Sequence, residues 1–237
     1  MLLSHKGCRV ATSAADRPAD TSYRLGRERP SATVVERGFK LFRCLQRVEP
    51  TLMDELDQVL SKYATSQDLM DRIRYVSESL SISFDRWDEK YVSGPSLYFL
   101  IVAETDFETY TDSLGENVWP TDRCKLASDS SEKFKQVAED VAFSRDGAII
   151  VTGDGTIQKQ MVRVRSPSPN EVPEVTQLSY PDWMGTKHMS ALETSLRENV
   201  LWAITLSEED GRVTTYLDGT YQDYPREEIG GRWRPEA

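Results

Sequence analysis

The segment SLYFLIVA, residues 96–103, is a nearly continuous run of apolar side chains in an otherwise polar chain. A strand that is buried on both faces has this composition, because side chains on either side of the pleat meet apolar neighbours. A second run, VLWAITL at residues 200–206, has the same character. We therefore expect a central sheet that contains both segments as buried strands.

The pattern around these two strands alternates between helix and strand. Apolar spacing typical of helices covers residues 131–143 and residues 186 to about 199. The runs 148–152 (AIIVT) and 156–164 (TIQKQMVRV) flank Gly-Asp-Gly, which indicates a β-hairpin. Residues 208–211 are expected to form a turn before a closing strand at 212–217, whereas 104–127 and the four-proline segment 165–183 are expected to be mostly loop. This order predicts an α/β fold with a mixed central β-sheet flanked by helices.

Composition changes along the chain divide it into four regions. Residues 1–33 lack a hydrophobic period and are expected to be flexible. Residues 34–85 are expected to be a mainly helical N-terminal extension, with helices from about 51 to 63 and from 66 to about 80 that pack against the next region or a twin subunit. Residues 86–222 would form the α/β domain, and the charged tail 223–237 would be frayed.

The chain is acidic, with a formal net charge of −10 at pH 7 and a pI of about 4.9. Such a chain is repelled from phosphate at long range, so we expect neither nucleic acid nor an anionic membrane as a partner. It holds 9 Lys against 20 Arg, and an acidic surface with few lysines is typical of halophilic proteins. The alternative is an ordinary acidic cytosolic protein from a GC-rich gene.

The three cysteines are widely spaced and form no CxxC pair, which argues against a disulfide framework and against a zinc site. The first residues lack the apolar stretch of a secretion signal. No apolar run approaches the ~20 residues needed to span a bilayer. We therefore expect a cytoplasmic protein.

A short motif, Asp146-Gly147-Ala148, stands where a helical pattern ends and a strand pattern begins. Glycine lets a ligand approach the backbone closely, and an aspartate beside it can hold a metal ion or accept a proton from a hydroxyl. Taken alone, an Asp-Gly pair before a strand is more often an ordinary turn.

A second motif, Gly185-Thr186-Lys187-His188, opens the last predicted helix. Backbone N–H groups at a helix start, a hydroxyl, an ammonium and an imidazole together suit a triphosphate. The alternative is an ordinary helix start with Thr186 as its N-cap, and a lone histidine is more often structural than catalytic.

A third motif, Ser207-Glu208-Glu209, follows the apolar run at 200–206. Ligands of α/β sheets bind at strand ends, and two carboxylates there could coordinate a divalent cation. An isolated pair of this kind could equally be a solvated turn.

The order and spacing of the three motifs resemble the diadenylate cyclase domain of DisA-type proteins. The resemblance covers about residues 90–218 and is most specific where GTKHMSALETS leads into VLWAITLSEEDG. These segments are similar to the family's GTRHR-type helix and to its apolar strand closed by SEE-x-G. With its acidic composition, the chain is most similar to the soluble archaeal branch, in particular the haloarchaeal type.

The resemblance implies a reaction and its partners. In this family two ATP molecules condense into the second messenger cyclic di-AMP, and two pyrophosphates are released. Each subunit holds one ATP, so the resemblance implies a homo-oligomer that is at least a face-to-face dimer. It also implies Mn²⁺ or Mg²⁺ as cofactor, and no membrane or nucleic-acid partner is expected.

The resemblance also implies residue roles. Asp146, Lys187 and His188 would be catalytic, with Asp146 activating the 3′-hydroxyl directly or through a metal ion. Glu208 would bind the metal ion together with Asp146, and Glu209 would share that task or support it. The ATP-binding positions would be Gly147 and Ala148 at the nucleoside, Val164 near the adenine, and Gly185, Thr186, Lys187, His188 and Ser207 at the triphosphate.

Two positions depart from the family's pattern. The usual Arg-His-Arg is Lys187-His188-Met189 here, and methionine keeps neither charge nor donors. The usual Leu-Pro after the hairpin strand is Val-Arg. Other basic groups, such as Arg163, Arg165 or Arg197, would then hold part of the triphosphate. The departures leave open a catalytically weakened nucleotide-binding regulator, or an interaction protein whose N-terminal helices carry the function.

Overall fold

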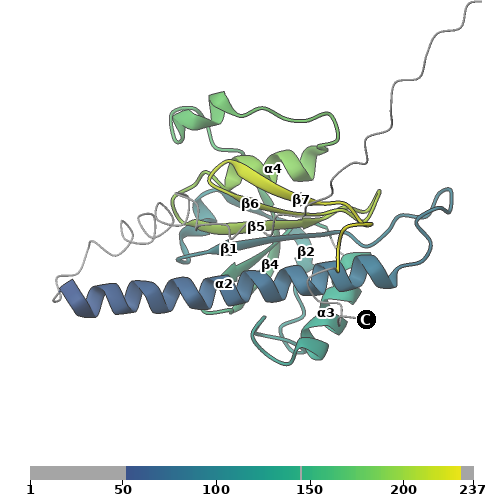
Figure 1. Ribbon diagram of the computed structural model, residues 1–237, viewed down its shortest axis with the longest axis horizontal. Coiled ribbons are helices and arrows are strands. Elements are labelled where there is room, and N and C mark those ends of the chain that lie inside the picture. The colour runs from purple at the N-terminus through teal and green to yellow at the C-terminus, as the bar shows by residue number, and fades with distance from the viewer. Residues whose placement is uncertain (1–51, 145, 231–237) are drawn as a thin grey trace, which may run out of the picture.

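The two apolar runs lie side by side at the centre of a seven-stranded sheet. β1 (Leu97–Val102) pairs antiparallel with β5 (Val200–Leu206), and all side chains of β1 are buried. The computed structural model describes residues 52–144 and 146–230, and Figure 1 shows the sheet between layers of helices. The predicted α/β fold with a mixed central sheet is therefore confirmed.

The strand order of the sheet is β2-β4-β3-β1-β5-β6-β7. β1 is parallel to β3 and the other pairings are antiparallel, which makes the sheet mixed. A parallel neighbour requires a long crossover, which here contains a 3₁₀ turn, η1, then β2 and α3. The remaining strands and the crossover elements are β2 (Thr111–Val118), β3 (Ala148–Thr152), β4 (Ile157–Val164), β6 (Val213–Leu217), β7 (Thr220–Tyr224), η1 (Asp106–Thr109) and α3 (Ser131–Ser144).

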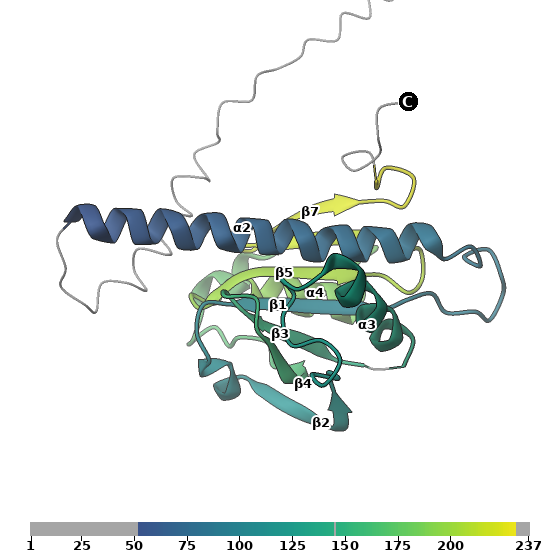
Figure 2. The same cartoon turned by 90° about the horizontal axis from the view of Figure 1, so that it is seen from below.

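Helices cover the two faces of the sheet unequally. α2 (Leu52–Ser83) and α3 lie on one face, and the short α4 (Thr186–Thr194) lies on the other, as Figures 1 and 2 show. Alternate side chains of β1 enter two separate hydrophobic clusters: Phe99 packs with α2 and α3, whereas Tyr98 packs with α4. Because α2 contributes Ile73 and Val76 to the first cluster, it is part of the same core as the strands.

The prediction of two helices between residues 51 and 80 is wrong, because α2 is one continuous helix of 32 residues. Ala64 and Thr65, which lie between the two predicted helices, carry at most a modest helical penalty, which tertiary packing outweighs. Ser66, where the second helix was expected to begin, is buried, and the Ser77 hydroxyl donates to the Ile73 carbonyl within the helix. Neither residue provides the proline or glycine that would stop a helix.

Three further expectations need correction. Residues 111–118 form β2, although most of residues 104–127 were expected to be loop. The last predicted helix stops at Thr194 instead of continuing to about residue 199. The tail is not frayed through residue 230: β7 pairs with β6, Ile229 is 2% exposed, and the Gly230 N–H donates to Glu78 at 3.2 Å.

The other predicted elements are confirmed. The β3–β4 hairpin, α3, β5 and β6 fall where the pattern placed them, within a residue or two. The flexible segment expected at residues 1–33 lies outside the described residues. Among the described residues, none of the helices has the length and apolar character needed to cross a membrane.

Candidate functional site

A cavity of about 750 Å³ lies between the sheet and the start of α4. Its volume suits a ligand the size of a nucleotide. It is lined by the first residues of β1 and β3, by the last residues of β4 and by the turn that follows β5. In this mixed sheet the cavity therefore lies at the amino ends of two strands and at the carboxyl ends of two others. The cavity therefore gathers several segments that are far apart in the sequence.

All the predicted catalytic, ATP-binding and metal-binding positions line this one cavity. Of the three alternative basic groups, Arg163 lines it and Arg165 and Arg197 do not: Arg165 pairs with Asp112, and Arg197 stacks on Tyr110. The singled-out residues that the fold brings together are Asp146, Gly147, Ala148, Val164, Gly185, Thr186, Lys187, His188, Ser207, Glu208 and Glu209.

The turn that carries Asp146 depends on glycine. Gly147 has φ +97°, a left-handed conformation that side chains disfavour. A Cβ there would lie 2.7 Å from Leu114 Cδ1 and 2.9 Å from the Val162 carbonyl oxygen. The Gly147 N–H donates to Asp146 Oδ1 at 2.7 Å, which fixes one carboxylate oxygen of this exposed side chain.

The start of α4 faces the cavity without a side-chain cap. Gly185 is the N-cap, with an extended backbone (φ −80°, ψ 178°), so the alternative in which Thr186 caps the helix is wrong. Thr186 is the first helical residue and no acidic side chain lies in the first turn. The first N–H groups of a helix attract anions, and here nothing on the first turn competes for them.

Lys187 reaches from α4 across the cavity floor. Its ammonium donates to Ser96 Oγ before β1 and, at 3.1 Å, to the carbonyl of Leu206 at the end of β5. Burial lowers the pKa of Lys187, while the nearby carboxylates of Glu208 and Asp146 oppose that shift. The lysine thus links two central strands and lies within the electrostatic reach of both acidic motifs.

His188 is buried and uncharged. Its side chain is 7% exposed on the cavity wall, and its Nε2 has no hydrogen-bond partner among the described residues. Burial and the neighbouring ammonium of Lys187 lower the pKa of His188 to about 4. A neutral imidazole offers one donor and one acceptor, so His188 can bind a ligand by hydrogen bonding but brings no positive charge at neutral pH.

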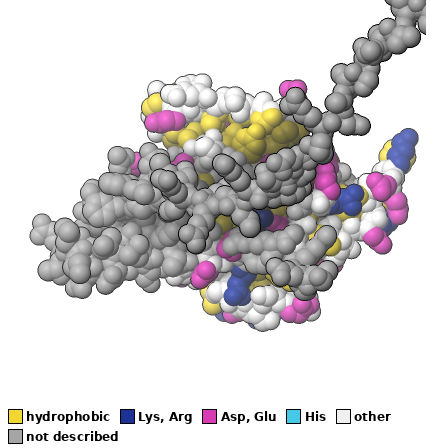
Figure 3. Space-filling view, viewed as in Figure 1, with side chains coloured by type: hydrophobic (Ala, Val, Ile, Leu, Met, Phe, Trp, Pro, Cys, Tyr) yellow, Lys and Arg dark blue, Asp and Glu magenta, His cyan; other side chains and the backbone are white. Residues whose placement is uncertain are grey.

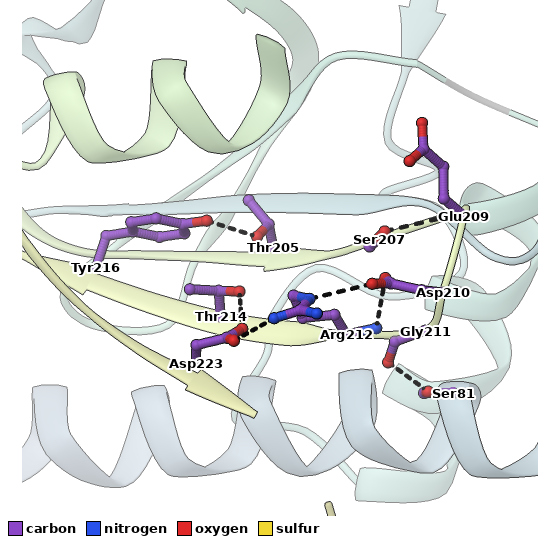
Figure 4. A network of polar contacts seen from close by, with 10 residues as sticks. All are labelled: Ser81, Thr205, Ser207, Glu209, Asp210, Gly211, Arg212, Thr214, Tyr216 and Asp223. Atoms are coloured by element: carbon purple, nitrogen blue, oxygen red, sulfur yellow. Dashed lines mark hydrogen bonds and ion pairs between the residues drawn. The ribbon is translucent and has the colours of Figure 1, made fainter. Parts of the chain in front are cut away.

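The acidic turn after β5 is fixed by its backbone. The Ser207 N–H donates to the Arg212 carbonyl at 2.9 Å, and Ser207 Oγ accepts from the Glu209 N–H at 3.3 Å. Glu208 and Glu209 are both exposed, and Figure 4 shows the Glu209 carboxylate pointing away from the polar network behind it. Exposed carboxylates on a turn held by backbone hydrogen bonds can coordinate a divalent cation.

A charged network beside this turn was not predicted from the sequence (Figure 4). Arg212 pairs with Asp210 at 3.1 Å and with Asp223 of β7, whose other oxygen accepts from Thr214 at 3.0 Å. The guanidinium lies 4.6 Å from the ring centre of Trp183. Arg212 lies three residues after Glu209, which is a usable signal, but its contact with Asp223 depends on strand pairing that no local pattern shows.

Trp183 forms an aromatic wall of the cavity. Its ring meets His188 edge-on at 5.3 Å and Tyr221 of β7 at 5.8 Å. Figure 3 shows apolar side chains gathered over α4 and β7, on the outer surface of this layer. The sequence shows that Trp183 stands close to the second motif, but it does not show how the indole ring is oriented.

Charge at the cavity favours a ligand that carries its own cation. Nowhere in residues 52–144 and 146–230 do three or more His, Cys, Asp or Glu side chains form a metal cluster. Mg²⁺ and Mn²⁺ are commonly held by one or two carboxylates together with substrate phosphates, which fits this lining. The lining carboxylates are Asp146, Glu193, Glu208, Glu209 and Asp210, against the cations Arg163, Lys187 and Arg212.

Comparisons with known proteins give distant similarities. No family model and no curated protein sequence matches the chain. Among solved structures, it is similar to an engineered double-cysteine variant of DacA from Staphylococcus aureus, at 17% identity, with 68% of this chain and 89% of that chain covered and a TM-score of 0.41. It is also similar to a hypothetical membrane spanning protein from Bacillus cereus, at 15% identity, with 81% and 88% covered and a TM-score of 0.44. Similarities this distant assign no function.

Proposed function

We propose that the chain is a diadenylate cyclase, which condenses two ATP molecules into cyclic di-AMP and releases two pyrophosphates. One observation carries the proposal: the three sequence motifs, centred on Asp146, Lys187 and Glu208, line a single cavity of nucleotide size. Their separate structural explanations, an ordinary turn or a capped helix, give no reason for this convergence.

Residues of the chain can both activate the attacking hydroxyl and bind the triphosphate. Asp146 accepts the proton of the 3′-hydroxyl, and its position is set by the Gly147 N–H. The uncapped first turn of α4, the Lys187 ammonium and the neutral imidazole of His188 bind the triphosphate. Since one nucleotide is the nucleophile for the other, positioning and charge neutralisation make up most of the catalysis.

Asp146 and Glu208 are the groups that would hold Mg²⁺ or Mn²⁺. Both line the cavity, and both lie close enough to Lys187 to influence its pKa. When bound, a divalent cation neutralises phosphate charge and polarises the phosphoryl oxygens. The excess of carboxylates over cations in the lining supports entry of ATP as a metal complex.

The reaction needs two copies of the chain. One cavity of this volume holds one nucleotide, so the attacking hydroxyl comes from an ATP in a second subunit. The carboxylates of Asp146, Glu208 and Glu209 are exposed, which leaves them accessible to a facing subunit. We therefore propose a face-to-face homodimer as the smallest active unit.

The direct test is incubation of the purified chain with ATP and Mn²⁺, read by mass spectrometry for cyclic di-AMP. We expect product from the wild type and none from Asp146→Asn, with unchanged circular dichroism. Asp140→Asn is the matched control, because that exposed carboxylate of α3 does not line the cavity. Full activity of Asp146→Asn contradicts the assignment of the base.

A second candidate is a nucleotide-binding regulator without turnover. It is favoured by the low positive charge of the second motif. His188 is neutral, burial lowers the pKa of Lys187, and Met189 carries no charge. Calorimetry that detects ATP binding, combined with absence of cyclic di-AMP at saturating ATP and Mn²⁺, identifies this candidate.

A further inference from the structure

The three cations that line the described cavity differ in how firmly they are held. Lys187 is partly buried, and burial lowers its pKa. The side chain of Arg163 is 68% exposed and pairs with Asp112 of the neighbouring strand at 2.9 Å. The side chain of Arg212 is only 20% exposed, and three separate segments fix it.

Each of these segments restrains a different part of the Arg212 guanidinium. Asp210, in the turn, accepts from Nε, and Asp223, on β7, accepts from Nη1 (Figure 4). Trp183, just before α4, lies 4.6 Å from the guanidinium carbon and covers it. Thr214 in turn fixes Asp223 with a 3.0 Å hydrogen bond. The result is a planar cation with a defined orientation at the cavity wall.

Arg212 retains donors for a ligand. A guanidinium has five N–H groups, and the two carboxylates take one on Nε and one on Nη1. Within the described part of the chain, the remaining N–H groups of Arg212 have no hydrogen-bond partner, although the residue lines the cavity. A rigid fork with free donors suits the paired oxygens of a phosphate, and its charge persists at any working pH.

We propose that Arg212 binds a phosphate group of the ligand in this cavity, with Asp210, Asp223 and Trp183 as positioning residues. The identity of that ligand as a nucleoside triphosphate rests on the proposed function. Arg212 then supplies a permanent charge that neither His188 nor Met189 provides in the second motif. The opposing explanation is that Arg212 only joins β7 to the turn.

Calorimetry with inorganic tripolyphosphate and Mg²⁺ tests the proposal without requiring turnover. We expect Arg212→Gln to raise the Kd by about 10- to 100-fold, as expected for loss of a charge-assisted hydrogen bond, and Arg212→Lys to give a smaller rise. Arg123→Gln is the matched control, because Arg123 pairs with Asp140 outside the cavity. The Kd of this variant for tripolyphosphate should equal that of the wild type. A wild-type Kd in a folded Arg212→Gln variant overturns the proposal.

Loss of Arg212 leaves two carboxylates without their cation, which could unfold the variant. The double variant Arg212→Gln/Asp223→Asn removes one of those charges, and its fold is checked by near-UV circular dichroism. If the folded double variant binds tripolyphosphate as tightly as the wild type, Arg212 is structural only. We expect instead weak binding and a smaller salt dependence of the Kd, because one fewer cation contacts phosphate.

The positioning residues require a different readout. The Asp223→Asn variant keeps the Arg212 guanidinium but restrains its orientation less. We therefore expect a smaller rise in the Kd for tripolyphosphate than in Arg212→Gln, and the same salt dependence of the Kd as in the wild type. A purely structural role for Asp223 would lower the melting temperature and leave the Kd for tripolyphosphate unchanged. That result removes Asp223 from the proposal.

The outcomes separate this inference from the proposed reaction. Tripolyphosphate binding that depends on Arg212, without any cyclic di-AMP, supports the inference and contradicts the reaction. Cyclic di-AMP formation with an unchanged Kd in Arg212→Gln supports the reaction and overturns the inference. A wild-type chain that binds neither ATP nor tripolyphosphate overturns both.

Discussion

The hydroxyl of Ser81, near the end of α2, donates a 2.6 Å hydrogen bond to the carbonyl oxygen of Gly211, 130 residues away. The bond is buried and Gly211 closes the turn that carries Glu208 and Glu209. Figure 4 shows Ser81 on the helix beside this turn, bonded to Gly211. The long N-terminal helix therefore supports the backbone from which the acidic motif projects.

Trp87 completes this support from the segment after α2. A Cβ at Gly94 would come within 2.2 Å of its ring, and a Cβ at Gly211 within 2.8 Å, so the indole fits closely against two glycines. The Trp87 Nε1–H donates to the Ser81 carbonyl at 3.1 Å, and the Gly94 N–H donates to the Glu208 carbonyl at 2.9 Å. The position of the acidic turn thus depends on contacts on its far side from the cavity.

Ser81→Ala should weaken both fold and activity. The variant leaves the Gly211 carbonyl buried without its donor, so we expect the free energy of unfolding to fall by about 1–3 kcal/mol. Because Gly211 closes the acidic turn, the rate of cyclic di-AMP formation at saturating ATP should also fall. Ser83→Ala is the control, since that hydroxyl bonds only within α2. Lower stability with an unchanged rate would show that the contact does not position the turn.

Gly147→Ala should disrupt the turn before β3. A left-handed conformation costs an alanine about 1–2 kcal/mol, and its Cβ would also press on Leu114 and on the Val162 carbonyl. We expect a lower denaturation midpoint in urea and loss of product, because the neighbouring Asp146 must move. At Gly153 an added Cβ meets ordinary contacts, at 3.5 Å and beyond, so Gly153→Ala is the matched control for stability. Equal stability of the two variants contradicts this explanation.

The central elements were predictable because their signals are local. β1 and β5 are apolar along their whole length since both of their faces are buried. The β3–β4 hairpin is encoded by its turn, where Asp154 accepts hydrogen bonds from Thr152 and Thr156 and Gly155 has φ +87°. In each case neighbouring residues determine the conformation.

The two edge strands of the sheet were not predictable, because their conformation depends on residues that are distant in the sequence. β2 (TDSLGENV) and β7 (TYQDY) are polar, and β7 is largely exposed. They are strands because β4 and β6 offer open edges to pair with. The same limit applies to the site. The motifs at Asp146 and Lys187 could be found locally, whereas the contact between Arg212 and Asp223 exists only once β6 and β7 have paired.

Stability should fall in mild acid because of His188. Burial lowers the pKa of His188 to about 4, whereas an unfolded chain has an imidazole pKa of about 6.5. Between these values the unfolded state binds more protons, so stability is lost as the pH falls from about 6.5 towards 4, by up to about 3 kcal/mol. Carboxylates also titrate in this range, so the measurement is the difference between wild type and His188→Gln in urea at pH 7 and pH 4.5. An equal loss in both proteins contradicts the prediction.

Lys187→Met should separate binding from folding. The variant removes a partly buried charge but also removes a donor to the Leu206 carbonyl. The two effects on the free energy of unfolding oppose each other, and the net change should stay within about 2 kcal/mol. The cavity loses a cation, and we expect the Kd for ATP with Mg²⁺ to rise about 10-fold or more in calorimetry. Lys133→Met on α3, outside the cavity, is the control.

The pH dependence of ATP binding sharpens the test of Lys187. Because burial lowers the pKa of Lys187, its ammonium loses its proton at a lower pH than an exposed lysine, whose pKa is about 10.4. Wild-type affinity for ATP should therefore weaken with rising pH before the range in which an exposed lysine loses its proton. The Lys187→Met variant should lack this step, since its side chain has no proton to lose. If the variant shows the same loss of ATP affinity at alkaline pH, the titrating group is not Lys187. Lys187 then does not bind the phosphates.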